Sequence, residues 1–77
     1  MHLYFFHLHR CGKVILDREG TSLASIDEAR RFAKLEAREL IIRILATEEP
    51  VPFDDGIEVA DEHGAVLHRA TFEEALK

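Results

Sequence analysis

The middle of the chain carries apolar residues at every third or fourth position, which is the period of an amphipathic helix with one buried stripe. Ser25 opens a capping box before this segment: its hydroxyl can accept from the backbone N–H of Glu28, while the Glu28 carboxylate reaches back to Ser25. Pro50 and Pro52 cannot enter a helix interior. We therefore predict one long helix from Ser25 to about Thr47, with this apolar stripe: Ala29, Phe32, Ala33, Ala37, Leu40, Ile41, Ile44 and Leu45.

Shorter apolar stretches on both sides of this helix have the composition of strands. Leu3–His9 is rich in aromatic residues, and Val14–Leu16 follows a turn in which Gly12 can take the positive φ of a tight hairpin. Ile57–Val59 and Ala65–Arg69 are separated by turn residues and predict a second hairpin.

The remaining segments connect these elements. Asp17–Ser22 is polar, contains a glycine and is expected to be a loop, whereas 48–55 is expected to be an exposed connector anchored by Phe53. Thr71-Phe72-Glu73-Glu74 repeats the capping-box spacing and predicts one terminal turn of helix. The sequence thus predicts a single α+β domain over 1–77, with the order β-β-α-β-β and an antiparallel sheet packed by the long helix on one face.

The first predicted strand is apolar on both of its faces. If its even-numbered apolar residues face the helix, then Leu3, Phe5 and His7 form a second face that the helix does not cover. A domain of this size buries only about 60% of its unfolded surface, so association would stabilise it. We expect this face to be an interaction surface, with a homodimer as the first expectation and an unidentified protein partner as the other.

The balance of charge disfavours some partners. The chain has 15 acidic and 10 basic residues, and the segment 48–62 contains acidic residues but no lysine or arginine. A net charge of −5 opposes bulk attraction to nucleic acid or to an anionic membrane. We therefore expect neither as a partner.

Cysteine usage and the amino-terminal residues bear on the compartment. Cys11 is the only cysteine, so no disulfide can form within the chain, and a lone thiol fits a reducing compartment. The first residues lack a basic region, a long apolar run and a cleavage site, so no signal peptide is expected, and no apolar stretch reaches the roughly 18 residues of a membrane span. We expect a cytoplasmic protein.

His7, His9 and Cys11 share strand parity, so their side chains could project from one face at a separation that Zn²⁺ accepts. Cys11 falls in the predicted turn, however, and the sequence places no fourth ligand. The alternative is that His7 packs among aromatic residues and that His9 is solvated. An exposed thiol at a hairpin tip also offers no substrate cleft. We expect no metal, no cofactor and no enzymatic activity.

Arg31, Lys34 and Arg38 form a basic stripe on the helix, which is a possible contact for an anion or for nucleic acid. Acidic residues stand four positions before Arg31 and Arg43, a spacing at which a solvated helix face forms its own ion pairs. We expect this second interpretation to hold.

Three motifs together resemble a family of short bacterial proteins catalogued only as a domain of unknown function. They are the opening Tyr4-Phe5-Phe6-His7, the acidic-glycine loop Asp17-Arg18-Glu19-Gly20 and the hairpin Ile57-Glu58-Val59-Ala60-Asp61-Glu62. The likeness extends over nearly the whole chain. It implies a bacterial cytoplasmic protein and brings no catalytic residues with it.

A second likeness concerns the helix start. Ser25-Ile26-Asp27-Glu28-Ala29 is similar to the cap that follows a strand pair in antitoxins of the HicB kind, although the Pro-rich strand motif of those antitoxins is missing. This likeness implies an alternative function, a regulatory module that docks on a partner or associates with nucleic acid through the basic stripe of the helix.

Overall fold

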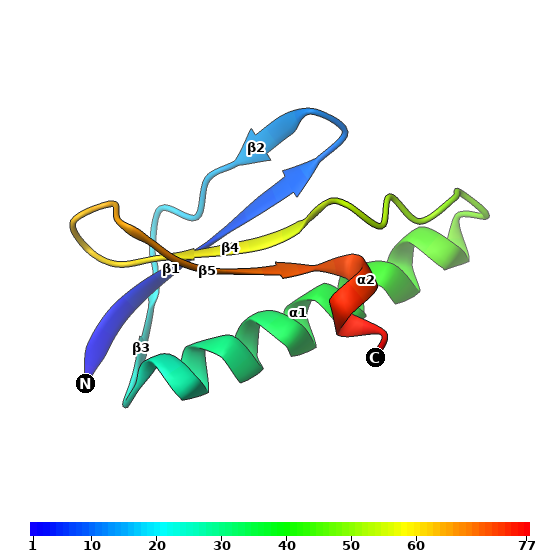
Figure 1. The fold of residues 1–77 in the computed structure, drawn as a ribbon. Coiled ribbons are helices and arrows are strands. Elements are labelled where there is room, and N and C mark those ends of the chain that lie inside the picture. The colour runs from blue at the N-terminus through cyan, green and yellow to red at the C-terminus, as the bar shows by residue number, and fades with distance from the viewer.

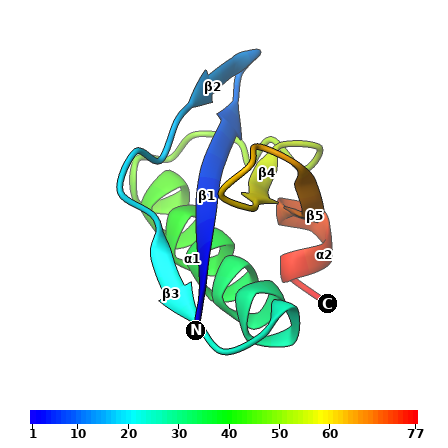
Figure 2. The same ribbon diagram turned by 90° about the vertical axis from the view of Figure 1, so that its left-hand side faces the viewer.

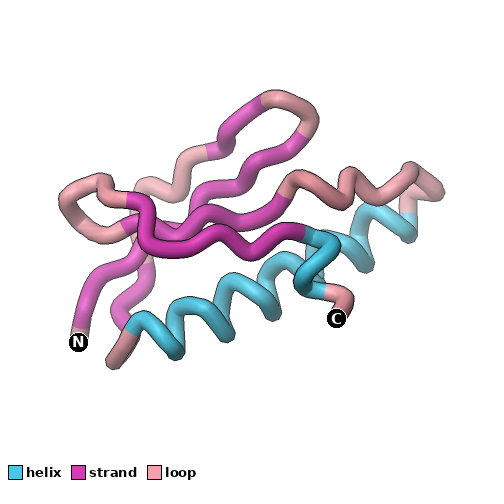
Figure 3. The backbone as a smooth tube through the Cα atoms, viewed as in Figure 1, coloured by secondary structure: helices cyan, strands magenta, loops and turns pink.

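Five antiparallel strands and two helices make up the computed structural model, which describes residues 1–77 (Figure 1). Their bounds are β1 (His2–Arg10), β2 (Lys13–Ile15), β3 (Thr21–Leu23), α1 (Ile26–Ala46), β4 (Gly56–Ala60), β5 (Val66–Thr71) and α2 (Phe72–Ala75). The strands form one layer and α1 lies along one face of it (Figure 3). The predicted α+β class, the long helix and the terminal helical turn are confirmed.

The sheet is built around β1, in the order β2-β1-β4-β5. One edge of β1 pairs with β4, whereas its other edge pairs with two short strands in succession, β2 along residues 8–10 and β3 along residues 2–4. The β1–β2 hairpin therefore projects beyond the layer that α1 covers (Figure 2). None of the helices is long and apolar enough to cross a membrane.

Small side chains let α1 approach the sheet closely. Ala29, Ala33 and Ala37 are fully buried along the predicted stripe, and larger residues of the sheet fill the space above them. Tyr4 is buried on β1, and the ring of Phe6 lies 4.6 Å from that of Phe32. The even-numbered apolar residues of β1 thus face the helix, which is the alternative under which Leu3, Phe5 and His7 lie on the other face.

Both predicted caps are present, with one difference. The Ser25 hydroxyl accepts from the Glu28 N–H at 3.2 Å, and the Thr71 hydroxyl accepts from the Glu74 N–H at 3.1 Å. The Glu28 carboxylate, however, accepts from the N–H of Ala24 rather than from that of Ser25. Ser25 has an extended backbone, which brings the preceding amide within reach of this carboxylate.

The β1–β2 turn contains two residues with positive φ, whereas the sequence predicted a positive φ only at Gly12. Arg10 pairs directly with Lys13, which leaves a two-residue turn in which Cys11 has a φ of 54° and Gly12 a φ of 75°. Two positive φ values are the signature of the hairpin turn that matches strand twist. The Cys11 N–H donates to the Asp55 carboxylate at 2.8 Å, which ties this turn to the connector before β4.

Two expectations about connecting segments are wrong. Thr21–Leu23 is a strand and not part of a loop, because β1 extends past β2 and offers an unpaired edge that the chain rejoins after Gly20. Phe53 is half exposed and anchors nothing, while Val51 of the same connector packs against the core.

Candidate functional site

The sheet face opposite α1 carries the predicted interaction residues Leu3, Phe5 and His7. All three are half-buried, and the Phe5 and His7 rings lie parallel at 6.3 Å. The sequence suggested that this face is uncovered, but in the structure a loop covers part of it. A Cβ placed on Gly20 would lie 2.9 Å from Leu3 Cδ1 and 3.1 Å from Phe5 Cε1, so the loop between β2 and β3 packs on it. A wide apolar surface is therefore missing here.

Asp17 holds that loop in place. Its Oδ2 accepts from the Phe6 N–H and its Oδ1 from the N–H groups of Glu19 and Gly20, each at 3.1 Å. Its own N–H donates to His7 Nδ1 at 3.1 Å, so this ring nitrogen is already occupied. Burial alone would raise the pKa of the Asp17 carboxyl, but these three amide donors and the neighbouring His7 lower the pKa below its ordinary value of 3.8.

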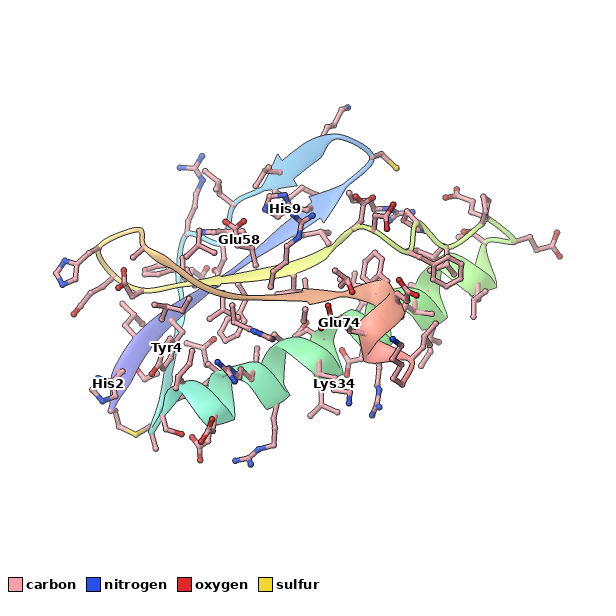
Figure 4. The ribbon with its side chains drawn as sticks, viewed as in Figure 1. His2, Tyr4, His9, Lys34, Glu58 and Glu74 are labelled. Carbon is pink, nitrogen blue, oxygen red and sulfur yellow. The ribbon has the colours of Figure 1, made fainter.

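His9, the second histidine of the possible zinc ligands His7, His9 and Cys11, lies beside Glu58. His9 Nε2 is 2.9 Å from Glu58 Oε2, on the sheet face away from α1 (Figure 4), and both side chains are about four-fifths covered. His9 is therefore not solvated, and its Nε2 lies beside this carboxylate without making an aligned hydrogen bond. Cys11 is exposed in the turn. Across the whole chain, no three histidine, cysteine or acidic side chains lie where one metal ion could join them.

Three consecutive exposed apolar residues lie on and beside β2 in the projecting hairpin. Val14, Ile15 and Leu16 are 49%, 60% and 55% exposed, and β2 is an edge strand with one side unpaired. A groove of about 330 Å³, which we term the apolar groove, continues from it toward α1. It is lined by the apolar residues Phe6, Leu8, Ile15, Leu16 and Phe32 and by the polar residues Asp17, Thr21 and Glu36. Sequence reasoning treated Val14–Leu16 only as a strand. A strand with one solvated face would alternate apolar and polar residues, so three consecutive apolar residues were the sequence signal for an interaction surface here.

The basic stripe does not neutralise itself as expected. Arg31 and Arg43 come within 4 Å of no carboxylate, since the ion pairs of the structure involve only His9, Arg10 and His63. Exposed pairs of this kind contribute only about 0.2–0.5 kcal/mol, too little to order two long side chains. Arg38 instead donates to the backbone oxygen of Ala75, so it joins α1 to α2.

The rest of the stripe lines a second hollow, which we term the basic groove. It has a volume of about 200 Å³ and lies between α1, β5 and α2, with this lining: Arg30, Arg31, Lys34, His68, Ala70, Glu74 and Ala75. Figure 4 shows Lys34 on α1 and Glu74 on α2, on the covered side of the sheet. The sequence identified Arg31 and Lys34 but not His68 or Glu74, because only the tertiary fold brings β5 and α2 against this flank of the helix.

Comparison with known proteins places the chain in a family. Residues 3–73 match the family model described as Domain of unknown function (DUF6894), so the chain belongs to that family. No curated protein matches it. No solved structure matches it either.

Proposed function

We propose that this DUF6894 domain is a non-enzymatic interaction module that forms a homodimer through the edge of β2 and the apolar groove beside it. Self-association follows the expectation from the sequence, but the surface shifts from Leu3, Phe5 and His7, which the loop after β2 partly covers, to the projecting hairpin. The observation that carries the proposal is the exposure of Val14 and Ile15 on the unpaired edge strand β2, together with that of Leu16, the residue that follows it.

The occupant of this surface is a second copy because an edge strand is complementary to itself. Two copies of β2 can pair antiparallel about a two-fold axis, so that the free N–H and C=O groups of each strand bond to the other. The opposite edge is less suited. In β5 the extra residue Leu67 interrupts the register, and a bulge of this kind protects a strand edge against pairing.

The exposed area implies a weak dimer. Full burial of a valine, leucine or isoleucine side chain contributes about 1.5–3 kcal/mol, so covering the exposed halves of three such side chains in both copies contributes about 4–9 kcal/mol. Association itself costs an estimated 4–15 kcal/mol before backbone hydrogen bonds are added. These terms leave at best about 5 kcal/mol, and each backbone hydrogen bond adds about 0.5–1.5 kcal/mol, so we expect a dissociation constant between the micromolar and the millimolar range.

The non-enzymatic part of the proposal rests on how the candidate polar groups are used. Asp17 Oδ1 and Oδ2 and His7 Nδ1 all accept hydrogen bonds from backbone amides, and these bonds hold the fold. The one exposed thiol, Cys11, stands at a turn without a cleft and is compatible with a reducing bacterial cytoplasm.

Solution mass measured against concentration tests the proposal. We expect the mean mass from light scattering to rise toward twice the chain mass as protein concentration increases. Ile15→Ser should abolish this rise, whereas Ile42→Ser, a matched control at an exposed isoleucine on α1, should not. A mass that stays monomeric at all concentrations, or an equal effect of the two substitutions, would contradict the proposed interface.

A further inference from the structure

The flank of α1 away from the apolar groove has a different chemistry. We propose that the basic groove is a binding site for the phosphoryl group of a small phosphorylated molecule. Arg31 and Lys34 are its principal anion contacts, Arg30 adds a third positive charge, and His68 offers an imidazole as a hydrogen-bond partner. This site lies across α1 from β2 and is independent of the proposed dimer.

The fold gathers these side chains from two elements. Arg30 and Lys34 stand one helical turn apart on α1, while His68 and Ala70 project from the helix-facing side of β5, because they pair in register with the buried Val59 and Ile57. The small side chain of Ala70 leaves the space between them open. The result is a hollow with a concentration of positive charge in a chain whose net charge is −5.

These cations have no partner within the protein. No carboxylate oxygen lies within 4 Å of Arg30, Arg31 or Lys34, although Lys34 is half-buried. Arg38 shows the contrast, since its guanidinium donates to Ala75 O at 2.6 Å and to Lys77 O at 3.4 Å. Lys34 is half-buried whereas Arg30 and Arg31 are exposed, and unpaired cations that line a concave site focus positive potential on whatever enters it. An anion would satisfy them.

The far wall of the groove is fixed in advance. Helix α2 is capped by Thr71, anchored by the fully buried Phe72 and held to α1 by Arg38. The Phe72 N–H also donates to Asp55 O at 2.8 Å. A ligand therefore would not have to order this wall, which lowers the entropic cost of binding.

Size and charge select the ligand class. The hollow, at about 200 Å³, is smaller than the roughly 300–1,000 Å³ of sites for drug-sized ligands, so it suits a small molecule. Guanidinium groups match phosphoryl oxygens with paired hydrogen bonds. Glu74 at the rim would accept a hydrogen bond from a hydroxyl group of the same ligand. A long polyanion is disfavoured because its flanking phosphates would approach an acidic chain.

Calorimetric titration with glycerol phosphate, and with inorganic phosphate for the anion alone, tests this proposal. We expect saturable binding that weakens at least about tenfold in Arg31→Gln with Lys34→Gln, since each removes a charge-assisted hydrogen bond. Arg43→Gln is the matched control, as Arg43 lies on the same helix outside the groove. Circular dichroism confirms that each variant is folded.

The adjacent residues Glu73 and Glu74 allow a second test, in which a substitution should strengthen binding instead of weakening it. Glu74→Gln should strengthen binding of inorganic phosphate several-fold, whereas Glu73→Gln, with the same change in net charge, should not, because Glu73 does not line the groove. Equal effects of these two substitutions, or no saturable binding of either probe, would overturn the proposal. It would also be overturned if single-stranded RNA bound with an affinity that grows with length and falls steeply with salt, which would favour nucleic acid instead.

Discussion

Replacing Asp17 with alanine should remove the one carboxylate that supports the interrupted edge of β1. Between β2 and β3 no strand pairs with β1, and the Asp17 Oδ2 takes the place of the missing ladder acceptor for the Phe6 N–H. Its Oδ1 meanwhile closes the following loop through Glu19 and Gly20. In the alanine variant these three amides lose their acceptor together.

The magnitude follows from the exposure of the three donors. A hydrogen bond to a charged acceptor contributes about 1.5–3 kcal/mol, but water replaces the acceptor wherever the donor is exposed, as it is at Glu19. Counting the part-buried Phe6 and Gly20 bonds at about half strength gives a loss of about 1.5–3 kcal/mol in the free energy of unfolding. Stability of about 0.05–0.15 kcal/mol per residue predicts about 4–12 kcal/mol in total, so the loss is large.

The same carboxylate should make stability depend on pH in one direction. Its pKa is lower in the folded protein than the ordinary 3.8, because the amide donors and His7 outweigh burial. A group with a depressed folded pKa contributes its full stability above the unfolded pKa and loses that contribution as pH falls through the folded pKa. Asp17→Asn should therefore flatten the decline in stability below about pH 4.

Urea unfolding at neutral pH and at a series of acid pH values measures both effects. Asp54→Ala serves as the control, since Asp54 is an exposed acid whose side chain makes no hydrogen bond, and we expect it to stay within about 0.5 kcal/mol of the parent. If Asp17→Ala were as stable as Asp54→Ala, the loop would not depend on this carboxylate and the reasoning would be refuted.

Two further predictions concern the backbone and the histidines. Gly56→Ala should destabilise the fold by about 3 kcal/mol or more, because its Cβ would overlap the backbone of Ala70 and of the next residue, while Gly64→Ala should cost only about 1–2 kcal/mol for its positive φ; equal midpoints in urea would contradict this. Stoichiometric Zn²⁺ should leave the melting temperature unmoved, because His7 Nδ1 is occupied and His9 lies against Glu58; a shift that grows with zinc and vanishes in His7→Ala and His9→Ala would contradict it.

The long helix could be predicted almost to the residue. Its limits depend on local chemistry, because Ser25 caps its start and the prolines after Thr47 cannot continue it. Its buried stripe follows from the three- and four-residue spacing of the apolar residues alone. Parity likewise divided the residues of β1 into two faces, and the structure shows that the even-numbered face, one of the two alternatives, lies against the helix. Local and periodic signals of this kind need no knowledge of the partner elements.

The errors share a tertiary origin. Thr21–Leu23 is a strand only because β1 extends past β2, and no local signal marks this extension. Leu3 and Phe5 lose their exposure to a loop that Asp17 folds back across them. The basic groove requires β5 and α2 to lie beside α1, which spacing along the helix could not reveal.

Intermolecular contacts in a mixed sample test the central claim, self-association through β2, most directly. The sample combines isotope-labelled and unlabelled chains, and filtered nuclear Overhauser spectra then report only protons that are close across the interface. We predict intermolecular signals between the β2 strands of two copies, centred on Val14 and Ile15, that grow with concentration. Signals confined to the Leu3 and Phe5 face, or none at a concentration where the mass is dimeric, would contradict the account.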